Sequence, residues 1–332
     1  LVMNFVYACN DSYVRLLGSS FFSLFDGNRG CPRIAVYVLS LGLSADNQNR
    51  LEEIAARYGR ELVFVEMGDL KDRIGFQADT GGYDISIMSR LFMGEMLPDC
   101  VKRVLYLDCD TVVVRSLKGL WHTDLEGKVM GAVMEPTIYE AVKASVGLGR
   151  EQPYFNSGVL LVDLGQWRER QVQSRLLDFW RDKGGKLFAS DQDVLNGVLK
   201  GEIKALATQY NFFTNYRYFS YGDLVRHSAS YGEVGEDRFV KAKKHPAIIH
   251  YMGDERPWIR GNLNHYRRAY DNYLAQTPWA GTPKERGKEI YMAVYHGLDY
   301  ATVLWPEIRW LISRKLGMRM VEARAARMRK ER

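Results

Sequence analysis

Strand-like and helix-like segments alternate from Asn4 to Asp110, and this alternation restricts the fold more than any other feature of the sequence. Short apolar runs rich in β-branched and aromatic residues predict strands, and apolar residues three or four positions apart predict helices. Alternating elements of this kind form a parallel sheet covered by helices on both faces. We therefore expect an α/β fold with a Rossmann-like, doubly wound mixed sheet that carries helices on both faces. The expected strands are 4–8, 33–39, 61–65 and 104–107, and the expected helices are 13–25, 44–58 and 85–97.

The second half of the chain contains shorter predicted elements. Between Tyr210 and Lys244 aromatic, glycine and charged residues mix without a period, which predicts long loops around an acceptor or a lid. The length of 332 residues allows one large domain with an appendage. We expect a main domain over 3–280 and a small, basic helical extension over 281–332. The other expected elements are strands 129–133 and 158–162 and helices 164–181 and 192–199.

The apolar run 104–107 is followed by two carboxylates one residue apart, Asp108 and Asp110. A strand that ends in Asp-x-Asp presents two hard oxygen ligands at its carboxyl end, where open α/β sheets bind their ligands. A Mg²⁺ or Mn²⁺ ion held there would neutralise a diphosphate. The same pair also ends many solvated strands, so other motifs have to decide between a metal site and a solvated turn.

The net charge of +6 is concentrated at the end of the chain, in the segment 306–332. The main body is nearly neutral, so we do not expect a nucleic-acid partner. In the last segment apolar and aromatic residues alternate with cations, as in a helix that lies on anionic lipid. The alternative is a solvated basic helix whose tryptophans pack on the body. The residues concerned are Trp305, Ile308, Arg309, Trp310, Leu311, Ile312, Arg314, Lys315, Leu316, Met318, Arg319, Met320, Arg324, Arg327, Arg329 and Lys330.

The four cysteines, Cys9, Cys31, Cys100 and Cys109, form no Cys-x-x-Cys pair and no regular framework. This spacing argues against a zinc site or a disulfide scaffold and favours a reducing compartment. No apolar run approaches the roughly 20 residues needed to cross a bilayer, and the first residues contain no basic stretch followed by an apolar one, so we expect no signal peptide. We therefore expect a cytoplasmic protein, peripheral on the inner face of the cell membrane if the basic segment binds lipid.

Three further motifs follow the Asp-x-Asp pair: Tyr-Phe-Asn-Ser-Gly-Val from Tyr154, Asp-Gln-Asp-Val-Leu-Asn from Asp191, and His-Tyr-Met-Gly-Asp-Glu-Arg-Pro-Trp from His250. With these motifs, the chain from Met3 to about Trp258 resembles the family-8 retaining glycosyltransferases, the group of bacterial lipooligosaccharide α-galactosyltransferases and glycogenin. The resemblance implies a GT-A fold, a nucleotide-sugar donor that is usually a UDP-hexose, a Mn²⁺ ion, and transfer with retained anomeric configuration.

The resemblance also implies a metal site. Asp108 and Asp110 match the family's metal-binding pair, His250 matches its third protein ligand, and Cys109 would lie beside the donor. This ligand set suits Mn²⁺ better than Mg²⁺, because imidazole is a poor Mg²⁺ ligand while carboxylates accept either ion. The metal would bridge the diphosphate.

Further matches concern the nucleotide. Ala8, Asn10 and Tyr13 match the residues that hold uracil and ribose, with Tyr13 as the stacking platform. The alternative for Tyr13 is a helix residue that faces the core. Arg90 matches an arginine near the diphosphate and the donor sugar, where a forked cation suits oxygen-rich ligands.

Other matches surround the donor hexose. Asn156, Asp191 and Gln192 match positions around the sugar; Asp191 would accept hydrogen bonds from its hydroxyls, and Gln192 would lie close to the anomeric carbon. Asp193 has two interpretations, a catalytic residue or a residue of the first turn of a helix. The second rests on the helix dipole, which favours an aspartate in that turn.

The chain departs from the family pattern at two positions. Gly253 and Arg256 match the loop that closes over the phosphates, but the family pattern has lysine where Arg256 stands. Glu135 stands where related sequences can carry aspartate beside the sugar. Arg256 keeps the positive charge and changes a point cation into a planar fork. The identity of the hexose, galactose or glucose, therefore stays open.

Together these expectations describe a metal-dependent retaining transferase that moves a hexose from a UDP-sugar to a glycan, glycolipid or glycoprotein. Asp191, Gln192 and Arg256 are its expected catalytic residues, with Arg256 stabilising the leaving UDP. Because Gln192 is a poor nucleophile, we favour attack from the face that UDP leaves.

Two alternative functions remain. A sugar nucleotidyltransferase needs a glycine-rich loop after its first strand, where this chain has Cys-Asn-Asp-Ser at 9–12. A non-catalytic nucleotide-sugar-binding membrane scaffold would use the basic segment, but the intact metal ligands argue against it.

Overall fold

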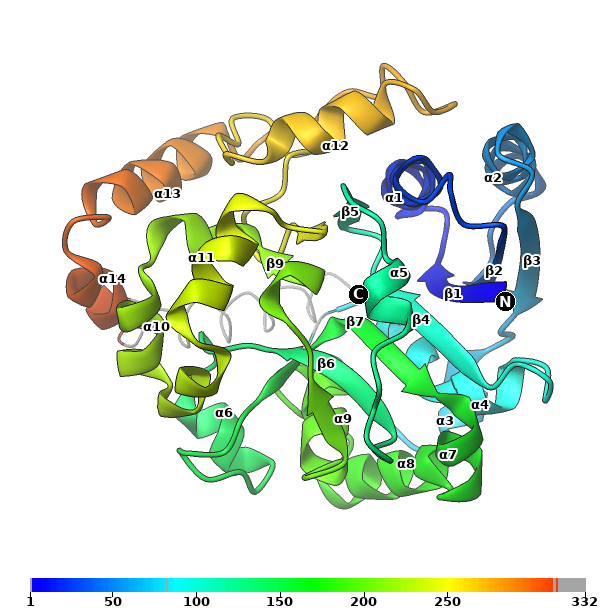
Figure 1. Ribbon diagram of the computed structural model, residues 1–332, viewed down its shortest axis with the longest axis horizontal. Coiled ribbons are helices and arrows are strands. Elements are labelled where there is room, and N and C mark those ends of the chain that lie inside the picture. The colour runs from blue at the N-terminus through cyan, green and yellow to red at the C-terminus, as the bar shows by residue number, and fades with distance from the viewer. Residues whose placement is uncertain (1, 82, 313–314, 316–332) are drawn as a thin grey trace.

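The structure is a computed structural model that describes residues 2–81, 83–312 and 315. Its strands form a seven-stranded sheet in the order β3-β2-β1-β4-β7-β6-β8 and a three-stranded sheet in the order β5-β10-β9 (Figure 1). The neighbours from β3 to β4 run parallel, whereas β7 runs antiparallel to both β4 and β6. The strands of the main sheet are β1 Val2–Cys9, β2 Arg33–Ser40, β3 Glu61–Glu66, β4 Arg103–Leu107, β6 Met130–Met134, β7 Phe155–Asp163 and β8 Ile203–Ala205.

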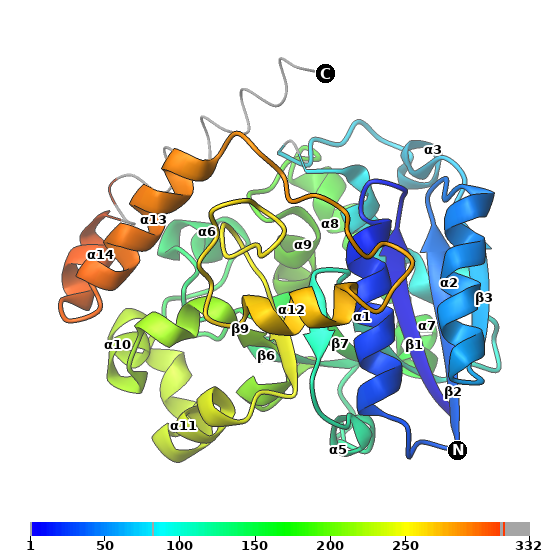
Figure 2. The same ribbon diagram turned by 90° about the horizontal axis from the view of Figure 1, so that it is seen from above.

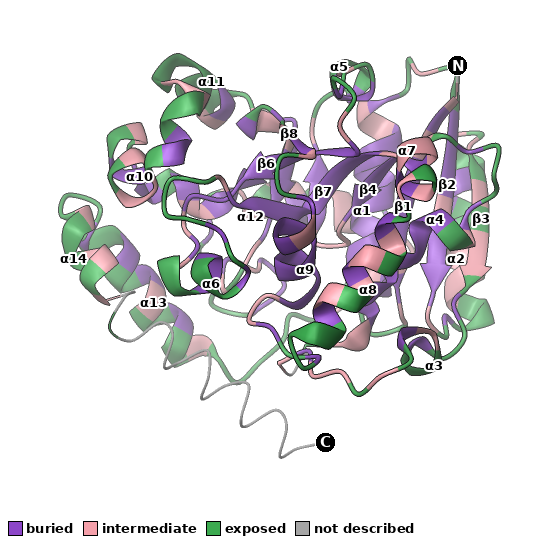
Figure 3. Cartoon of the chain, turned by 90° about the horizontal axis from the view of Figure 1, so that it is seen from below, coloured by how far each residue is buried: buried purple, intermediate pink, exposed green. Residues whose placement is uncertain are grey.

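Helices cover both faces of the main sheet, as Figures 2 and 3 show from opposite sides. The alternating side chains of β1 supply both cores, because Phe5 and Tyr7 pack under the first pair of helices and Val6 packs on the other face. The expected doubly wound mixed sheet with helices on both faces is therefore confirmed. The helices of the first face and then of the second are α1 Val14–Gly27 and α2 Ala45–Arg57, followed by α7 Leu164–Glu169, α8 Val172–Asp182 and α9 Ser190–Val198.

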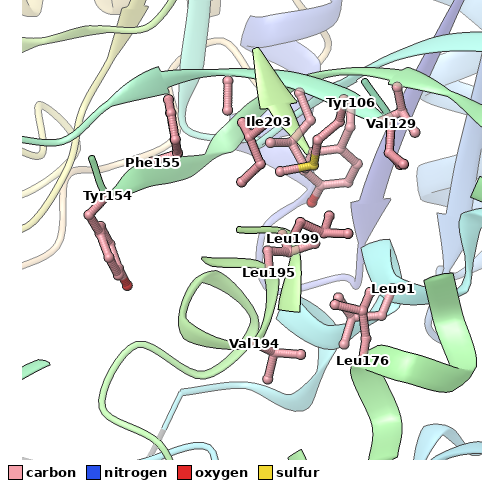
Figure 4. Packing of buried hydrophobic residues seen from close by; sticks show 14 of the residues in the cluster. Leu91, Tyr106, Val129, Tyr154, Phe155, Leu176, Val194, Leu195, Leu199 and Ile203 are labelled. Atoms are coloured by element: carbon pink, nitrogen blue, oxygen red, sulfur yellow. The ribbon is translucent and has the colours of Figure 1, made fainter. Parts of the chain in front are cut away.

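Packing against the sheet fixes the position of α9. Leu195 of α9 and Leu199 at its end point toward the sheet, and Tyr106 and Ile203 point from the sheet toward them (Figure 4). All four side chains are buried, and burying a large apolar side chain contributes roughly 1.5–3 kcal/mol. The second half of α9 is thereby held against the sheet.

The expected helix 85–97 has a different form. It is a 3₁₀ helix, η1 (Ile85–Phe92), followed by one turn of α-helix, α4 (Met93–Met96). Every residue of η1 from Met88 to Phe92 is buried, so burial follows no single face of this helix. The apolar spacing of so short a segment does not distinguish the two helix types.

The expected single helix 164–181 is also wrong, because the chain turns between α7 and α8. Gln171 has a left-handed backbone, with φ of 51°. Trp167 of α7 and Trp180 of α8 are both buried, so each helix has its own apolar face toward the core.

The segment from Tyr210 to Lys244, expected as long loops, is largely helical. This expectation was wrong because the helices are too short to show a period. Aromatic contacts hold them together: the ring of Phe239 lies 5.6 Å from that of Tyr216 and 6.2 Å from that of Tyr231. The elements are β9 Phe212–Phe213, η3 Thr214–Tyr218, α10 Tyr221–His227, η4 Ala229–Val234 and α11 Glu236–Lys244.

The small sheet brings two distant parts of the chain together. β5 (Thr111–Val113) directly follows the Asp-x-Asp pair, and β10 (Ile248–His250) runs antiparallel to it, with His250 opposite Thr111. β9 runs parallel to β10 on its other side. The remaining elements before the last two helices are α3 Leu70–Ile74, α5 Lys118–Trp121, α6 Glu140–Ser145, η2 Thr208–Tyr210 and α12 Arg267–Leu274.

The described chain ends with α13 (Glu289–Ala301) and α14 (Pro306–Ile312), which lie along one edge of the molecule (Figure 1). The ring of Trp310 stacks on Phe219 at 4.6 Å and on His227 at 3.9 Å. This tryptophan packs on the body, as the alternative interpretation of the basic segment expects.

Other apolar residues of the same segment face solvent, and Trp305 is 58% exposed. Within the described ranges, no helix combines the length and the apolar character that a membrane span requires. Several residues of the basic segment lie outside the described residues: Arg314, Leu316, Met318, Arg319, Met320, Arg324, Arg327, Arg329 and Lys330.

Candidate active site

The carboxyl ends of β1 and β4 border a cavity of about 360 Å³. The chain continues from β1 to β2 on one side while β4 lies on the other, so the strand order reverses here, where open α/β sheets bind ligands. The structure brings most of the predicted site residues to this cavity. Those that line it are Ala8, Tyr13, Arg90, Asp108, Cys109, Asp110, Asn156, Asp191, Gln192, Gly253 and Arg256.

Asp108, Asp110 and His250 meet beside this cavity. The two aspartates lie in the turn between β4 and β5, and the pairing of β10 with β5 brings His250 to them. Nε2 of His250 lies 3.2 Å from Oδ1 of Asp110 and 3.9 Å from Oδ2 of Asp108. One ligand atom from each residue lies within 4.8 Å of the other two. Two carboxylate oxygens and an imidazole nitrogen at this spacing can hold a divalent ion such as Mn²⁺.

A chain of hydrogen bonds determines which nitrogen of His250 carries the proton. The backbone N–H of Gly158 donates to Oδ1 of Asn156 at 2.8 Å, which identifies this atom as the amide oxygen. The Asn211 atom that lies 2.8 Å from the same oxygen must therefore be a donor, the amide nitrogen Nδ2. Oδ1 of Asn211 then faces Nδ1 of His250 at 2.9 Å, and Nδ1 must donate. In the neutral ring Nε2 then carries the lone pair and directs it toward the carboxylates, as a metal ligand requires.

The electrostatics of this cluster favour a cation. Burial lowers the pKa of His250, but Asp110 and Asp108 outweigh burial and raise the pKa above its ordinary value. Burial raises the pKa of Asp110, but His250 and Arg256 bring it below its ordinary value. A positive charge between these groups is therefore stabilised, and a divalent ion would supply it.

Gly158 on β7 has no side chain, and the cluster occupies the space that a side chain would fill. A Cβ atom at this position would lie 2.3 Å from Cε1 of His250 and 2.9 Å from Oδ2 of Asp108. The carbonyl of Gly158 also accepts the backbone N–H of Asp108 at 2.8 Å. Close approach of β7 to the Asp-x-Asp turn thus requires glycine.

Arg90 joins the Asp108–Asp110 pair to the motif that begins at Asp191. Its guanidinium is buried, and it donates to Oδ1 of Asp108 at 2.8 Å and to the carbonyl of Ser157 at 2.6 Å. Its Nε also lies 3.1 Å from Oδ2 of Asp191. Burial raises the pKa of Asp191 to about 6, against the opposing effect of Arg90. Arg90 therefore orients Asp108 by a hydrogen bond and places a positive charge beside Asp191.

Gln192, Asn156 and Glu135 form a buried network in the cavity wall. Nε2 of Gln192 donates to Oε2 of Glu135 at 2.9 Å, and its Oε1 accepts from Nδ2 of Asn156 at 2.9 Å and from the backbone of Ser157 at 3.0 Å. Burial raises the pKa of Glu135, and the two amides oppose the rise. The left-handed backbone of Ser190, with φ of 41°, lies directly before the motif. Strained backbone of this kind is common at functional sites.

Asp193 points away from the cavity. Its Oδ2 accepts the backbone N–H of Ala189 at 2.8 Å, and its Oδ1 accepts the hydroxyl of Tyr154 at 2.5 Å. The side chain is fully buried in the first turn of α9. The helix-start interpretation of Asp193 is therefore confirmed.

Beside the end of β1, Tyr13 lines the cavity at the N-cap position of α1 and is 42% exposed. The core-facing alternative for Tyr13 is therefore wrong. Asn10 lies next to the cavity without lining it, and its Oδ1 accepts the backbone N–H of Ser12 at 3.0 Å. The thiol of Cys109 donates to the carbonyl of Ala8 at 3.3 Å and joins the two strand ends.

The segment after β10 supplies a cation to the cavity. Gly253 has φ of 59°, a left-handed conformation that glycine adopts without strain. Nε of the half-buried Arg256 has no hydrogen-bond partner among the described residues. Because its charge already acts on Asp110, Arg256 can stabilise an anion bound next to the metal ligands.

Two residues of the site escaped the sequence reasoning. No motif or spacing marks Asn211, because only the parallel pairing of β9 with β10 brings it to His250. Tyr106 donates its hydroxyl to Oδ1 of Asp108 at 3.0 Å. Its position two residues before Asp108, on the same side of an expected strand, is a signal that could have identified it.

Comparisons with known proteins agree with this geometry. The family model described as "Glycosyl transferase family 8" matches residues 4–261. General stress protein A of Bacillus subtilis is 26% identical over 290 residues, which are 84% of this chain and 95% of that protein. Lipopolysaccharide 1,2-glucosyltransferase of Escherichia coli is 25% identical over 294 residues, 87% of this chain and 82% of that protein. The crystal structure of the galactosyltransferase LgtC with donor and acceptor sugar analogues has a TM-score of 0.71 at 26% identity and covers 83% of this chain and 96% of that chain.

Proposed function

Because the chain belongs to glycosyltransferase family 8 and has the GT-A fold, we propose that it transfers galactose or glucose from a UDP-sugar, with retained configuration, to a glycan, glycolipid or glycoprotein. The convergence of Asp108, Asp110 and His250 beside a cavity that also exposes Tyr13 and Arg256 carries this proposal. The lipopolysaccharide glucosyltransferase among its relatives supports a cell-envelope glycan as the acceptor.

Within this proposal, Asp108, Asp110 and His250 hold the metal, and Mn²⁺ is preferred to Mg²⁺ because of the imidazole ligand. A bound ion would neutralise the donor diphosphate and stabilise the negative charge of the leaving UDP. Asn211 keeps the lone pair of His250 directed at the site, and Arg90 orients Asp108.

The remaining residues would each contact a different part of the donor. Arg256 faces the diphosphate, where a planar fork can donate to two oxygens at once. Tyr13 offers an exposed ring on which uracil can stack. We assign the nucleoside to Ala8, Asn10, Tyr13 and Cys109, the hexose to Arg90, Asn156, Asp191 and Gln192, and the diphosphate to Gly253 and Arg256.

For the retained configuration we propose attack on the face that UDP leaves. The C1–O bond to UDP breaks, the acceptor oxygen bonds to C1 on the same face, and the acceptor proton passes to a phosphate oxygen of the departing UDP. Gln192, held by Glu135 and Asn156, presents an amide that is a poor nucleophile, and Asp191 is paired with Arg90. Both side chains are therefore better suited to stabilising positive charge on the sugar than to forming a covalent intermediate.

Release of UDP tests the proposal directly. The full chain is incubated without acceptor with UDP-galactose, UDP-glucose and the two UDP-N-acetylhexosamines, in Mn²⁺ or in EDTA. We expect slow release from one hexose donor that requires Mn²⁺ and disappears in Asp110→Ala. The matched control is Asp99→Ala, whose carboxylate is 97% exposed and outside the cavity. Absence of both release and UDP–Mn²⁺ binding would contradict the proposal.

The two alternative functions are less well supported. A sugar nucleotidyltransferase would form pyrophosphate from UTP and a sugar phosphate, but the segment after β1 contains no glycine in the stretch 9–12. A binding scaffold would bind UDP-sugar without releasing UDP. The same assay distinguishes all three functions.

We also propose that residues 281–332 form an extension beyond the transferase domain of 3–280 and contact an anionic membrane surface at the cytoplasmic face. Ile290, Leu304 and Trp305 are 83%, 75% and 58% exposed, and basic residues follow them in the sequence. Apolar side chains next to cations suit an anionic interface. Cosedimentation with phosphatidylglycerol vesicles should exceed that with phosphatidylcholine and fall several-fold in Trp305→Ser. Equal binding to both lipids would contradict this assignment.

A further inference from the structure

A second buried cluster of ionisable side chains lies where the segment after β10 meets α13. Glu255, His296 and Asp299 are 2%, 1% and 3% exposed, and one nitrogen or oxygen atom of each lies within 4.8 Å of the other two. None of the three lines the cavity. Glu255 lies in the segment that follows β10, while His296 and Asp299 lie on α13.

The cluster resembles a metal site in composition, but its hydrogen bonds argue against one. The backbone N–H of Leu263 donates to Nε2 of His296 at 2.9 Å, so the proton of the neutral ring lies on Nδ1. Nδ1 is the nitrogen that faces Asp299, at 3.7 Å, and it therefore offers a proton instead of a lone pair. Nη1 of Arg309 already lies 2.6 Å from Oδ1 of Asp299 and supplies a positive charge.

One positive charge does not balance two buried carboxylates. Both carboxyl oxygens of Glu255 and Oδ2 of Asp299 lack a hydrogen-bond partner among the described residues if both groups are ionised. A proton on one carboxyl group supplies the missing donor and removes one negative charge. Burial, reinforced by Asp299, raises the pKa of Glu255 to about 8, and burial raises the pKa of Asp299 to about 6 against the effect of Arg309.

The same carboxyl pair is connected to the cavity through the diphosphate loop, which we define as residues 252–257. The carbonyl of Glu255 accepts Nδ2 of Asn264 at 2.9 Å, and Oδ2 of Asp254 accepts the hydroxyl of Tyr291 at 2.9 Å. Arg256, the next residue, points into the cavity. The orientation of Arg256 therefore depends on how firmly this loop is attached to α13.

We propose that Glu255 and Asp299 share one proton, and that this pair fixes the diphosphate loop to α13 and α14 and so positions Arg256. Glu255 and Asp299 are positioning residues, and their effect on the donor rests on the proposed transferase function. Loss of the shared proton leaves two neighbouring carboxylates, which repel each other and loosen the loop.

The surrounding groups leave Glu255 as the residue that changes charge between pH 7 and 9. Tyr295 on α13 and Tyr218 on η3 face it with pKa values that burial raises above the ordinary value, so they stay neutral. Burial and nearby cations, including Arg267 of α12, lower the pKa of His296, which stays neutral as well. The fixed charges that face the pair are Arg309 of α14 and Asp254 of the loop itself.

Hydrogen exchange without any donor tests the shared proton. At pH 9 the amides of residues 253–256 should exchange several-fold faster in the wild type than in Glu255→Gln, which keeps a neutral hydrogen-bond donor. At pH 7 the two proteins should exchange alike. The control Glu236→Gln changes an exposed carboxylate of α11 and should match the wild type at both pH values. Equal exchange of wild type and Glu255→Gln at pH 9 would overturn the proposal.

A second variant keeps the test independent of one substitution. Asp299→Asn leaves a single carboxylate in the pair, so ionisation of Glu255 no longer creates repulsion and the rise in loop exchange from pH 7 to 9 should disappear. An unchanged pH dependence in this variant would contradict the pair. Manganese or zinc binding by Asp110→Ala that disappears in Asp110→Ala/Asp299→Asn would show a metal site in place of the shared proton.

The donor readout links the loop to catalysis. The kcat for UDP release should fall several-fold from pH 7 to 9 in the wild type and less in Glu255→Gln, with a smaller change in the KM for the UDP-sugar. A parallel fall in both proteins would overturn the positioning role. If no variant releases UDP, the transferase proposal fails while the exchange result still decides the shared proton.

Discussion

Asn211 accepts a hydrogen bond from Nδ1 of His250 through its Oδ1, at 2.9 Å, and thereby leaves Nε2 of His250 free to face Asp110. Asn211 in turn donates to Asn156, whose Oδ1 is held by the backbone N–H of Gly158. Two amides that connect His250 to the main sheet thus determine which imidazole nitrogen carries the proton.

Removing the acceptor of Asn211 should weaken the metal site without emptying it. In Asn211→Leu we expect Mn²⁺ affinity to fall about 10–100-fold, the usual effect of losing a partner of a ligating histidine. Isothermal titration calorimetry measures the change. Asn272→Leu, on the exposed end of α12, is the control and should bind Mn²⁺ normally. Unchanged affinity in a folded Asn211→Leu protein would contradict this role.

A methyl group at position 158 should displace His250. Gly158→Ala should lower UDP release on the order of 100-fold, because its Cβ would lie 2.3 Å from the imidazole. Overpacking should also destabilise the fold by roughly 1–3 kcal/mol, measurable by urea unfolding. Gly30→Ala serves as the control, since nothing lies within 4 Å of a Cβ there. Equal activity of the two variants would refute the steric argument.

Arg256 should act mainly through its charge. Arg256→Met should lower kcat for UDP release about 10²–10³-fold, because a cation at the leaving group is lost. Arg256→Lys should stay within about ten-fold of the wild type, since it keeps the charge and changes only its geometry. Arg260→Met removes a solvent-exposed cation a few residues away and should have little effect. Equal kcat values for the methionine and lysine variants at position 256 would argue against charge stabilisation.

Asp191 should make the fold less stable as pH rises. Its pKa of about 6 in the folded chain lies above the roughly 3.9 of an unfolded chain, so the folded state holds a proton that the unfolded state has lost. The associated stability is complete below pH 3.9 and is lost as the pH rises through 6. Relative to Asp191→Asn, the wild type should lose about 1 kcal/mol of unfolding free energy between pH 5 and 7.

Urea unfolding at the two pH values measures this difference. Asp46→Asn, whose parent carboxylate is 72% exposed, is the control and should follow the wild type. Parallel pH dependences of wild type and Asp191→Asn would mean that Asp191 is ionised throughout this range.

Gln192 should contribute to turnover more than to donor binding. Gln192→Ala removes the amide that Glu135 and Asn156 orient, and we expect kcat to fall about 100-fold with a smaller change in KM. Steady-state UDP release measures both constants. Gln276→Ala, at an exposed position beyond α12, is the control. Wild-type turnover in Gln192→Ala would exclude direct stabilisation of the sugar by this amide.

The sequence was sufficient to predict the α/β sheet and the residues that its strand ends carry. Asp108 and Asp110 follow a strand whose every residue is apolar or aromatic after Arg103, and such a pattern fixes both the strand and its end. The burial of Arg90 in the site was harder to predict from the sequence, because an arginine on a short helix is more often exposed. Its burial depends on Asp108 and Asp191, which reach it from two other elements.

Features that depend on contacts between distant residues could not be predicted from sequence patterns. The turn at Gln171 follows from the separate packing of Trp167 and Trp180, which no local period records. The short helices between Tyr210 and Lys244 are held together by contacts between aromatic rings of that segment. Their formation therefore depends on tertiary contacts, which a local sequence pattern does not record. Asn211 belongs to the same segment and escaped notice for the same reason.

The pairing of β10 with β5 also determines when the site can exist during synthesis. Asp108 and Asp110 leave the ribosome long before His250, and the Rossmann-like half of the sheet can form around them first. The third metal ligand arrives only when β10 adds to the exposed edge of β5, a contact between residues far apart in the chain that forms slowly. A nascent or truncated chain that stops before His250 therefore lacks a complete metal site, and tight Mn²⁺ binding would report that folding has reached this final step.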